Sequence, residues 1–216
     1  LSKFFQKCDS GHVYDFFRNK MKMSEINASL LSEITTIDIS KFELNANVKD
    51  WFQVVNGQLR YPIPVRHLPT GSCLSQLLAF FSYMDMFDEI YQYCSLKHFT
   101  LSVYVDDVVI SSKRRISKKS VKYVMYIFSK YGHEVNTSKI SSYIKDRPKK
   151  VTGIHINKDR QLKAPSKHHF TIKKMRCEFE ETRDPNSLKS LIGKIRYVNG
   201  IESAHFGNLA KTYEEI

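Results

Sequence analysis

A pair of adjacent aspartates, Asp106 and Asp107, constrains this chain more than any other feature. They stand between residues 101–105 and 108–112, two runs rich in strand-forming residues, so the sequence predicts an antiparallel hairpin with the acids at its tip. Asp-Asp suits a two-residue turn poorly, because the central residues need positive φ and the two charges repel each other. Oxygen ligands of this kind are what Mg²⁺ prefers, although an exposed acidic turn is the alternative interpretation.

The charge of the chain is strongly basic and unevenly distributed. The net charge is +12, and residues 139–176 contain twelve Lys or Arg but only two acids, Asp146 and Asp159. A polyanion is the expected partner of such a segment, because neutralising phosphates releases condensed counterions. A basic face that is merely solvated is the alternative.

The length of 216 residues suits one large domain, alone or with a small appendage, and 42% hydrophobic residues support a real core. No run of 18 apolar residues or signal peptide is found, so we expect no membrane span and a reducing, cytoplasmic setting. The scattered cysteines predict neither a zinc site nor a disulfide framework. Because the chain starts without methionine, in what reads as a strand, we expect a fragment of a longer protein.

Hydrophobic periodicity predicts mixed helices and strands. Helices are expected at residues 12–35, 74–93 and 117–131 and from 187 onward. Strands are expected on both sides of Asn56–Gly57 and near 140–143 and 150–156. Ser24 is the expected N-cap after a break in the first helix, and Gly132 is the expected end of the third.

Each helix is expected to turn one apolar stripe toward the core. The stripes, in chain order, are Val13, Phe16 and Phe17; Ile26, Leu30, Leu31 and Ile34; Leu74, Leu77, Leu78, Phe81, Met84 and Ile90; Val121, Val124, Met125 and Phe128; and Leu188, Leu191, Ile192, Ile195 and Val198. The order of the elements predicts an α+β fold, in which helices cover one face of an antiparallel sheet and leave the other face free. Asp106 and Asp107 would lie at its rim.

Several motifs, taken in order, resemble those of the reverse transcriptase family. Residues 104–107, Tyr-Val-Asp-Asp, match its Tyr-x-Asp-Asp signature. Residues 68–76, Leu-Pro-Thr-Gly-Ser-Cys-Leu-Ser-Gln, are similar to its Leu-Pro-Gln-Gly-x-x-x-Ser-Pro stretch, with Gln76 in place of the final proline. Gly132 followed by Lys139 resembles the next motif. Residues 151–153, Val-Thr-Gly, resemble a triplet of retron and related bacterial enzymes. Thr70 replaces the family's Gln, so contacts of that side chain do not carry over.

The resemblance implies a polymerase palm at residues 1–165 and part of a helical thumb at 166–216, with the N-terminal fingers outside this chain. Residues 1–5, Leu-Ser-Lys-Phe-Phe, are similar to the first motif without its aspartate, which would directly precede Leu1. Asp38 also fits that motif. It is rejected because the helical segment 12–35 would then precede the motif and too few residues would remain before Leu68.

The activity implied is that of an RNA-directed DNA polymerase, which joins deoxynucleoside triphosphates to a DNA or RNA primer on an RNA template. Two Mg²⁺ ions, or Mn²⁺ instead, would be held by Asp106 and Asp107. A cognate non-coding RNA or an effector protein, as in antiviral defence, is a further implied partner. The competing hypothesis is a catalytically inactive, palm-like domain that binds nucleic acid. A nuclease is disfavoured, since the acids lack further carboxylate and His partners.

The same resemblance implies roles for individual residues. Substrate-binding roles fall to Phe5 as a gate against the ribose 2′-hydroxyl, to Tyr104 at the primer end, and to the turn of Thr70, Gly71 and Ser72. Lys139 is the implied general acid for the leaving pyrophosphate. Phosphates of a bound duplex would be contacted by Lys189, Lys194 and Arg196. The alternative for Phe5 is a core aromatic residue, and the alternative for Tyr104 is an ordinary strand residue. Gly71 is alternatively a simple turn glycine, and Lys139 one of many surface lysines.

Overall fold

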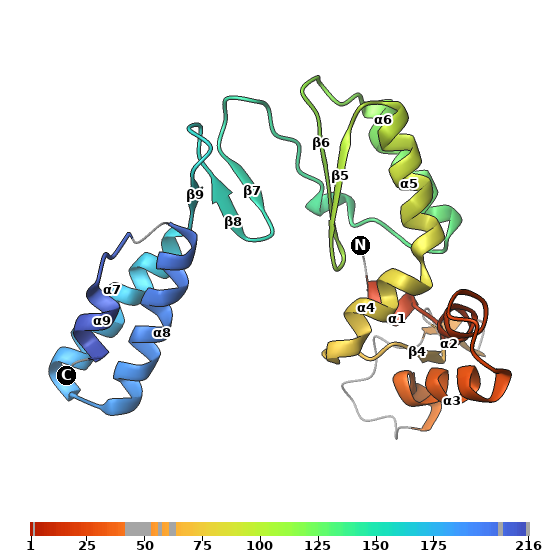
Figure 1. Cartoon of the computed structure of the whole chain (residues 1–216), viewed down its shortest axis with the longest axis horizontal. Coiled ribbons are helices and arrows are strands. Elements are labelled where there is room, and N and C mark those ends of the chain that lie inside the picture. The colour runs from red at the N-terminus through yellow and green to blue at the C-terminus, as the bar shows by residue number, and fades with distance from the viewer. Residues whose placement is uncertain (2, 42–52, 56–57, 61–63, 203–204, 215–216) are drawn as a thin grey trace. The chain divides into compact units, whose positions relative to one another are not determined.

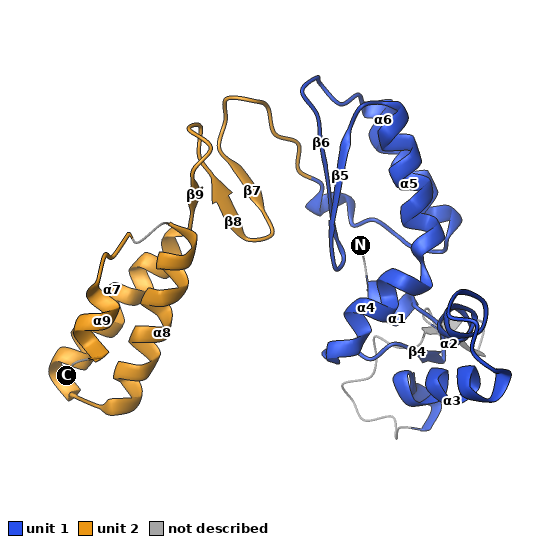
Figure 2. Ribbon diagram, viewed as in Figure 1, with its two compact units in different colours: residues 1–140 blue, residues 141–216 orange. Residues whose placement is uncertain are grey.

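The computed structural model describes the whole chain except residues 2, 42–52, 56–57, 61–63, 203–204 and 215–216 (Figure 1). It divides into two compact units, residues 1–140 and 141–216 (Figure 2). This division lies earlier than the boundary at residue 165 that the sequence predicts, because the small sheet after residue 148 belongs to the second unit. None of the described helices has the length and apolar character needed to cross a membrane.

The described residues of unit 1 form most of the helices and three small antiparallel sheets. Its helices are α1 (Phe4–Lys7), α2 (Ser10–Asp15), a π-helical turn (Phe16–Lys20), α3 (Glu25–Thr35), α4 (Cys73–Ser82), α5 (Met84–Leu96) and α6 (Lys118–Lys130), with 3₁₀ turns at Ile39–Lys41 and Thr137–Lys139. Its sheets pair β1 (Ile37–Asp38) with β4 (Arg66–His67), β2 (Gln53–Val55) with β3 (Gln58–Arg60), and β5 (Thr100–Tyr104) with β6 (Asp107–Ser111). The mixture is consistent with the predicted α+β class.

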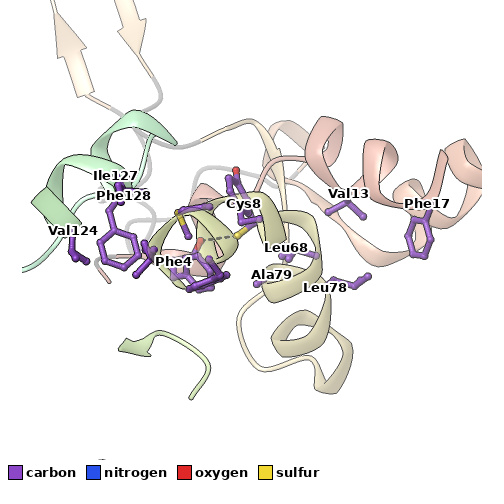
Figure 3. Packing of buried hydrophobic residues seen from close by; sticks show 14 of the residues in the cluster. Phe4, Cys8, Val13, Phe17, Leu68, Leu78, Ala79, Val124, Ile127 and Phe128 are labelled. Carbon is purple, nitrogen blue, oxygen red and sulfur yellow. Dashed lines mark hydrogen bonds between the residues drawn. The ribbon is translucent and has the colours of Figure 1, made fainter. Parts of the chain in front are cut away.

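The core of unit 1 gathers around the N-terminal segment (Figure 3). Phe4 is 3% exposed, and its ring meets the ring of Phe87 edge-on at 6.3 Å between centroids. Cys8 is fully buried and its Sγ donates a hydrogen bond to the carbonyl oxygen of Phe4 at 3.1 Å. The segment begins as helix α1, so the expectation that the chain starts in a strand is wrong.

Two of the predicted helix signals are confirmed by their caps. The hydroxyl of Ser24 accepts a hydrogen bond from the backbone N–H of Asn27 at 3.3 Å, at the start of α3. Helix α6 is followed by Gly132 at φ +78°, a conformation that favours glycine. Val124 and Phe128 of α6 are buried as predicted. Strands β2 and β3 also pair as predicted, whereas the Asn56–Gly57 turn itself lies outside the described residues.

The segment predicted as one helix at 74–93 is two helices, α4 and α5. The break is at Tyr83, whose φ of −114° and ψ of 26° are not helical. Its side chain is buried, and its hydroxyl donates a hydrogen bond to the carbonyl oxygen of Lys7 at 3.1 Å. The hydrogen bond from Tyr83 to α1 therefore accompanies a break between α4 and α5, where the sequence predicts one continuous helix.

The predicted inward stripes of α3 and α4 are largely wrong. Exposed side chains include Ile26, Leu30 and Ile34 of α3 and Leu74, Leu77 and Phe81 of α4. Leu78 of α4 is buried as predicted, but the other buried positions are smaller, Ala28 and Ser32 in α3 and Ser75 and Ala79 in α4. The Ser32 hydroxyl donates to the carbonyl oxygen of Ser10 at 2.8 Å, so the small side chain allows α3 to lie close to α2.

Unit 2 joins a three-stranded sheet to a helical hairpin. The strands are β7 (Lys149–Val151), β8 (Ile154–Ile156) and β9 (Leu162–Lys163), and the helices are α7 (Ser166–Thr182), α8 (Pro185–Ile201) and α9 (Leu209–Glu214). As predicted for the last helix, Leu191, Ile195 and Val198 are fully buried. The predicted strand at 140–143 is wrong, because these residues are irregular, and the one at 150–156 is the β7–β8 hairpin, with residues 152 and 153 at positive φ.

A buried carboxylate holds unit 2 together. The Glu202 side chain is 2% exposed and accepts hydrogen bonds from the backbone N–H of Ala164 at 2.8 Å and from Lys163 Nζ at 3.2 Å. His169 Nε2 lies 2.7 Å from Oε1 of this carboxylate. Burial alone would raise the pKa of Glu202, but the hydrogen bonds from His169, Ala164 and Lys163 outweigh it and lower the pKa.

Acid should destabilise unit 1 through His133. Its side chain is 1% exposed and packs on Tyr83 and Phe4, and neither ring nitrogen has a partner among the described residues. Burial, followed by the charges of Lys7 and His12, lowers its pKa from 6.5 to about 4. Because the unfolded chain takes up the proton first, stability is retained above about pH 6.5 and falls as the pH approaches 4, by up to about 3 kcal/mol.

Urea unfolding between pH 4.5 and 7.5 measures this, with His133→Leu as the comparison. The variant lacks the titrating group, so the difference in free energy of unfolding between the two proteins should change over this range. A constant difference at every pH would contradict the assignment.

Candidate functional site

The β5–β6 hairpin presents the two aspartates differently from the prediction. Tyr104 pairs with Asp107, so the two central residues of the turn are Val105 and Asp106, and Asp107 is the first residue of β6. Val105 has a φ of +57°, in the left-handed region. The prediction of a hairpin is confirmed, whereas the placement of both acids in its turn is wrong by one residue. The backbone strain falls on Val105, a β-branched residue.

The hairpin has one covered and one open face. Its side chains that pack against the core of unit 1 are Leu101, Val103, Val108 and Ile110. Since facing residues of an antiparallel pair share a face, Tyr104 and Asp107 lie on the opposite side. Tyr104 is 67% exposed. Strand β5 lies beside α5, so the core of unit 1 holds one face of the hairpin (Figure 1).

The two carboxylates are free to take a ligand. Asp106 is half-buried and Asp107 is exposed. Among the described residues, neither carboxylate has a hydrogen-bond or ion-pair partner. Adjacent like charges without a counter-charge favour binding of a cation, and carboxylate oxygens match the ligand preference of Mg²⁺ and Mn²⁺. The donor set therefore fits a hard divalent metal.

The N-terminal segment lies against the hairpin tip. The backbone nitrogen of Leu1 donates a hydrogen bond to the carbonyl oxygen of Asp106 at 2.8 Å. Phe4 faces the core, whereas Phe5 is half-buried, with its ring centroid 6.0 Å from that of Phe4. Residues 105 positions apart in the sequence are thus brought together.

The loop before α4 is held by hydrogen bonds at both ends, whereas Thr70 in its middle is exposed to solvent. Leu68 is fully buried and its N–H donates to the carbonyl oxygen of Cys8 at 3.0 Å. Thr70 is exposed, and Gly71 has a φ of +94°. A Cβ at Gly71 would meet no atom of the described residues within 4 Å, so backbone conformation alone calls for glycine. The Ser72 hydroxyl caps α4 by accepting from the N–H of Leu74 at 3.3 Å.

The predicted cationic residues are distributed over both units. Lys139 is exposed at the end of a 3₁₀ turn, and no hydrogen bond or ion pair joins it to the hairpin within the described part of the chain. On α8, Arg196 forms an ion pair with Glu214 at 2.6 Å, and Lys194 Nζ lies 5.5 Å from the centre of the Tyr197 ring. Lys189 is exposed. Of these four cations, Arg196 alone has an acidic partner among the described residues.

Asp38, the rejected first-motif candidate, is engaged elsewhere. Its carboxylate accepts hydrogen bonds from the N–H and the hydroxyl of Ser40, at 3.1 and 2.6 Å, and lies 3.5 Å from Arg66. The Ser40 hydroxyl hydrogen bond, with smaller help from Arg66, lowers the pKa of this carboxyl. These contacts support a structural role in the β1–β4 pair.

Replacing Val105 with glycine should stabilise the chain. A residue held in the left-handed region costs about 1–3 kcal/mol, part of which glycine loses again through its unfolded-state entropy. We expect Val105→Gly to raise the free energy of unfolding by about 1 kcal/mol. Val109→Gly, in the adjoining strand, should instead lower it by about 1 kcal/mol. Urea unfolding of both variants decides this, and equal destabilisation by the two would contradict the strained turn.

Sequence reasoning missed two clusters that the structure brings together. One is His133 with the aromatic rings of the unit 1 core. The other joins His169 to Glu202 and His205, with His205 Nδ1 3.3 Å from the Glu202 carboxylate. Of the adjacent histidines 168 and 169, His169 joins this cluster, whereas His168 packs on Tyr197. The local signal in the sequence was the short Glu-x-x-His spacing of residues 202–205.

Comparison with known protein families shows a match over the middle of the chain. Residues 27–156, more than half of the chain, match the family model described as reverse transcriptase (RNA-dependent DNA polymerase). The matched range includes the hairpin and the loop before α4, and it excludes residues 1–5 and the helices of unit 2. No curated protein matches the chain.

Proposed function

The chain belongs to the reverse transcriptase family, and on this premise we propose that it forms the catalytic palm and part of the thumb of a bacterial, retron-like RNA-directed DNA polymerase. The palm would extend over residues 1–165 and the thumb over 166–216. The proposed substrates are deoxynucleoside triphosphates, an RNA template and a DNA or RNA primer.

The observation that carries this proposal is the hairpin tip, with its two carboxylates that have no partner among the described residues. Members of this family generally use divalent metal ions, and Asp106 and Asp107 would hold them. The contact of the Leu1 nitrogen with the Asp106 carbonyl oxygen adds support. Leu1, which the sequence assigns to the first motif, therefore lies beside the hairpin tip.

The proposed reaction is nucleotidyl transfer. The primer 3′-hydroxyl oxygen bonds to the α-phosphorus of the incoming nucleotide and gives up its proton to water, and the bond from that phosphorus to pyrophosphate breaks. When bound, the metal ions supply electrostatic stabilisation of the attacking and leaving oxygens. Lys139 would donate the proton to the pyrophosphate, and Tyr104, on the open face beside Asp107, would contact the primer end. Gly71 would let the backbone of residues 70–72 approach the nucleotide.

Primer extension tests the proposal. The protein should be a chain extended upstream of Leu1, supplied with a primed RNA template, a primed DNA template and deoxynucleotides with Mg²⁺ or Mn²⁺. Extension on RNA supports the polymerase. Binding of the primed template without extension under any condition would favour the second candidate, an inactive palm-like binder, which the strongly basic segment 139–176 supports on its own.

The 216-residue chain should bind nucleic acid with a steep dependence on salt. Log affinity falls by about 0.9 for each phosphate contact per unit of log salt concentration. Lys189→Gln should therefore reduce the slope by about 0.9, because this cation is exposed. Arg196→Gln should change it less, since Arg196 is already paired with Glu214. Fluorescence anisotropy on a primed RNA between 50 and 300 mM salt measures the slopes, and affinity that does not vary with salt would contradict the phosphate contacts.

A further inference from the structure

Unit 2 contains a group of metal-ligating side chains remote in sequence from the aspartate hairpin. His169 lies in the first turn of α7, Glu202 directly follows α8, and His205 lies in the loop before α9. One ligand atom from each residue lies within 4.8 Å of the other two. The closest pairs join Glu202 to His169 at 2.7 Å and to His205 at 3.3 Å.

From this geometry we propose that His169, Glu202 and His205 bind one Zn²⁺ ion. Two imidazoles with one carboxylate suit zinc and its neighbours in the first transition row, whereas Mg²⁺ prefers oxygen ligands alone. Two ligand atoms on a tetrahedral zinc ion, each about 2.1 Å from it, lie about 3.4 Å apart. The two shortest observed separations, 2.7 and 3.3 Å, lie below this value, so side-chain rotations that move the ligands slightly apart make room for the ion.

The surroundings of the cluster favour the carboxylate as a ligand. The backbone N–H of Ala164 donates to Oε1 of Glu202 at 2.8 Å and holds the carboxylate in place, the kind of outer contact that orients metal ligands. Lys163 Nζ, 3.2 Å from Oε2, carries a charge that opposes a cation. Its side chain is 45% exposed, so it swings into solvent when the ion enters.

The proposed ion has a structural role. It would join the start of α7, the end of α8 and the loop before α9, three segments that the buried Glu202 carboxylate already links by polar contacts. Three protein ligands leave one position for water. Because the ion neutralises the carboxylate more fully than hydrogen bonds do, unit 2 should unfold at a higher temperature with zinc than without it.

Zinc titration of the 216-residue chain tests the site. Protein freed of metal by a chelator is titrated with Zn²⁺ in a calorimeter, and with Co²⁺ as a spectroscopic probe of tetrahedral coordination. We expect one ion per chain, tetrahedral Co²⁺ absorption, and a rise in melting temperature with Zn²⁺ but not with Mg²⁺. His169→Ala and His205→Ala should each weaken zinc binding by about 100-fold or more.

Matched controls separate this site from other causes. His168→Ala removes a neighbouring histidine that packs on Tyr197 and should leave binding unchanged. Cys177→Ser removes an exposed thiol and should also leave it unchanged. His205 is 44% exposed, so His205→Ala should melt in chelator within a few degrees of the unsubstituted chain, which shows that it still folds. Asp106→Asn should retain zinc, because the site does not depend on the proposed polymerase activity.

Two results would overturn the proposal. One is no binding of Zn²⁺ to the unsubstituted chain. The other is equal affinity in the unsubstituted chain and in folded His169→Ala and His205→Ala variants, since the ion would then lie elsewhere.

Discussion

Asp106→Asn should abolish DNA synthesis by the chain extended upstream of Leu1, while leaving it folded. The amide keeps the size of the side chain and removes the charge that would hold a divalent metal. Metal ions contribute several kcal/mol to the transition state of such reactions, and about 1.4 kcal/mol corresponds to tenfold in rate. We therefore expect primer extension to slow by about 10³-fold or more.

The thermal stability of Asp106→Asn should not fall together with its activity. Asp106 and Asp107 are adjacent and have no counter-charge among the described residues, so removing one charge relieves repulsion. In metal-free buffer Asp106→Asn should melt no lower than the parent. Thermal melts by circular dichroism alongside single-turnover primer extension measure both effects.

Asp88→Asn is the matched control for the loss of one acidic charge. Asp88 is exposed on α5, away from the turn, and its replacement should leave extension near the parental rate. If Asp106→Asn also extends primers at a near-parental rate, the assignment of Asp106 as a metal ligand is wrong.

The hairpin shows how far local sequence can determine a site. The runs around the aspartates predicted both strands, but not which residues would pair. In the observed register Leu101 faces Ile110 and Val103 faces Val108, so apolar residues meet on the covered side. A turn centred on Asp106 and Asp107 would have placed Leu101 opposite Ser112. Cross-strand packing against the core therefore selects the register, and strain at Val105 is its cost.

The faces of α3 and α4 could not be predicted by counting large apolar residues. Both helices approach their neighbours through small side chains, such as Ser75, whose hydroxyl donates to the carbonyl oxygen of Pro69 at 2.7 Å. Contacts of this kind depend on segments outside the helix itself. The same holds for Glu202, whose partners Ala164 and His169 come from other elements. Periodicity records the local amphipathic pattern, and tertiary contacts decide which face is used.

Phe4→Ala should destabilise the chain strongly, whereas Phe5→Ala should change its choice of sugar. Phe4 is 3% exposed at the centre of the unit 1 core, so truncating it should cost about 3–5 kcal/mol of stability. Phe5 follows Phe4 by about 100° around α1 and is only half-buried, packing against the edge of the same core.

The segment that carries both rings begins at Leu1, whose nitrogen contacts the Asp106 carbonyl oxygen. An aromatic ring of this segment near the hairpin tip would exclude a ribose 2′-hydroxyl by steric contact, and exclusion of this kind acts on the transition state as well as on binding. In the upstream-extended chain, Phe5→Ala and Phe5→Val should therefore admit ribonucleotides, with a moderate loss of rate for deoxynucleotides. Phe4→Ala should keep its preference for deoxynucleotides in whatever fraction remains folded.

Single-nucleotide incorporation of deoxy- against ribonucleotides, with urea unfolding of each variant, separates the two roles. Val at position 5 keeps a bulky apolar side chain, so a change in sugar choice without a change in stability would identify the ring itself as the gate. If Phe4→Ala relaxes sugar choice and Phe5→Ala only lowers stability, the first motif is displaced by one residue. The first-motif aspartate would then not be the residue directly before Leu1.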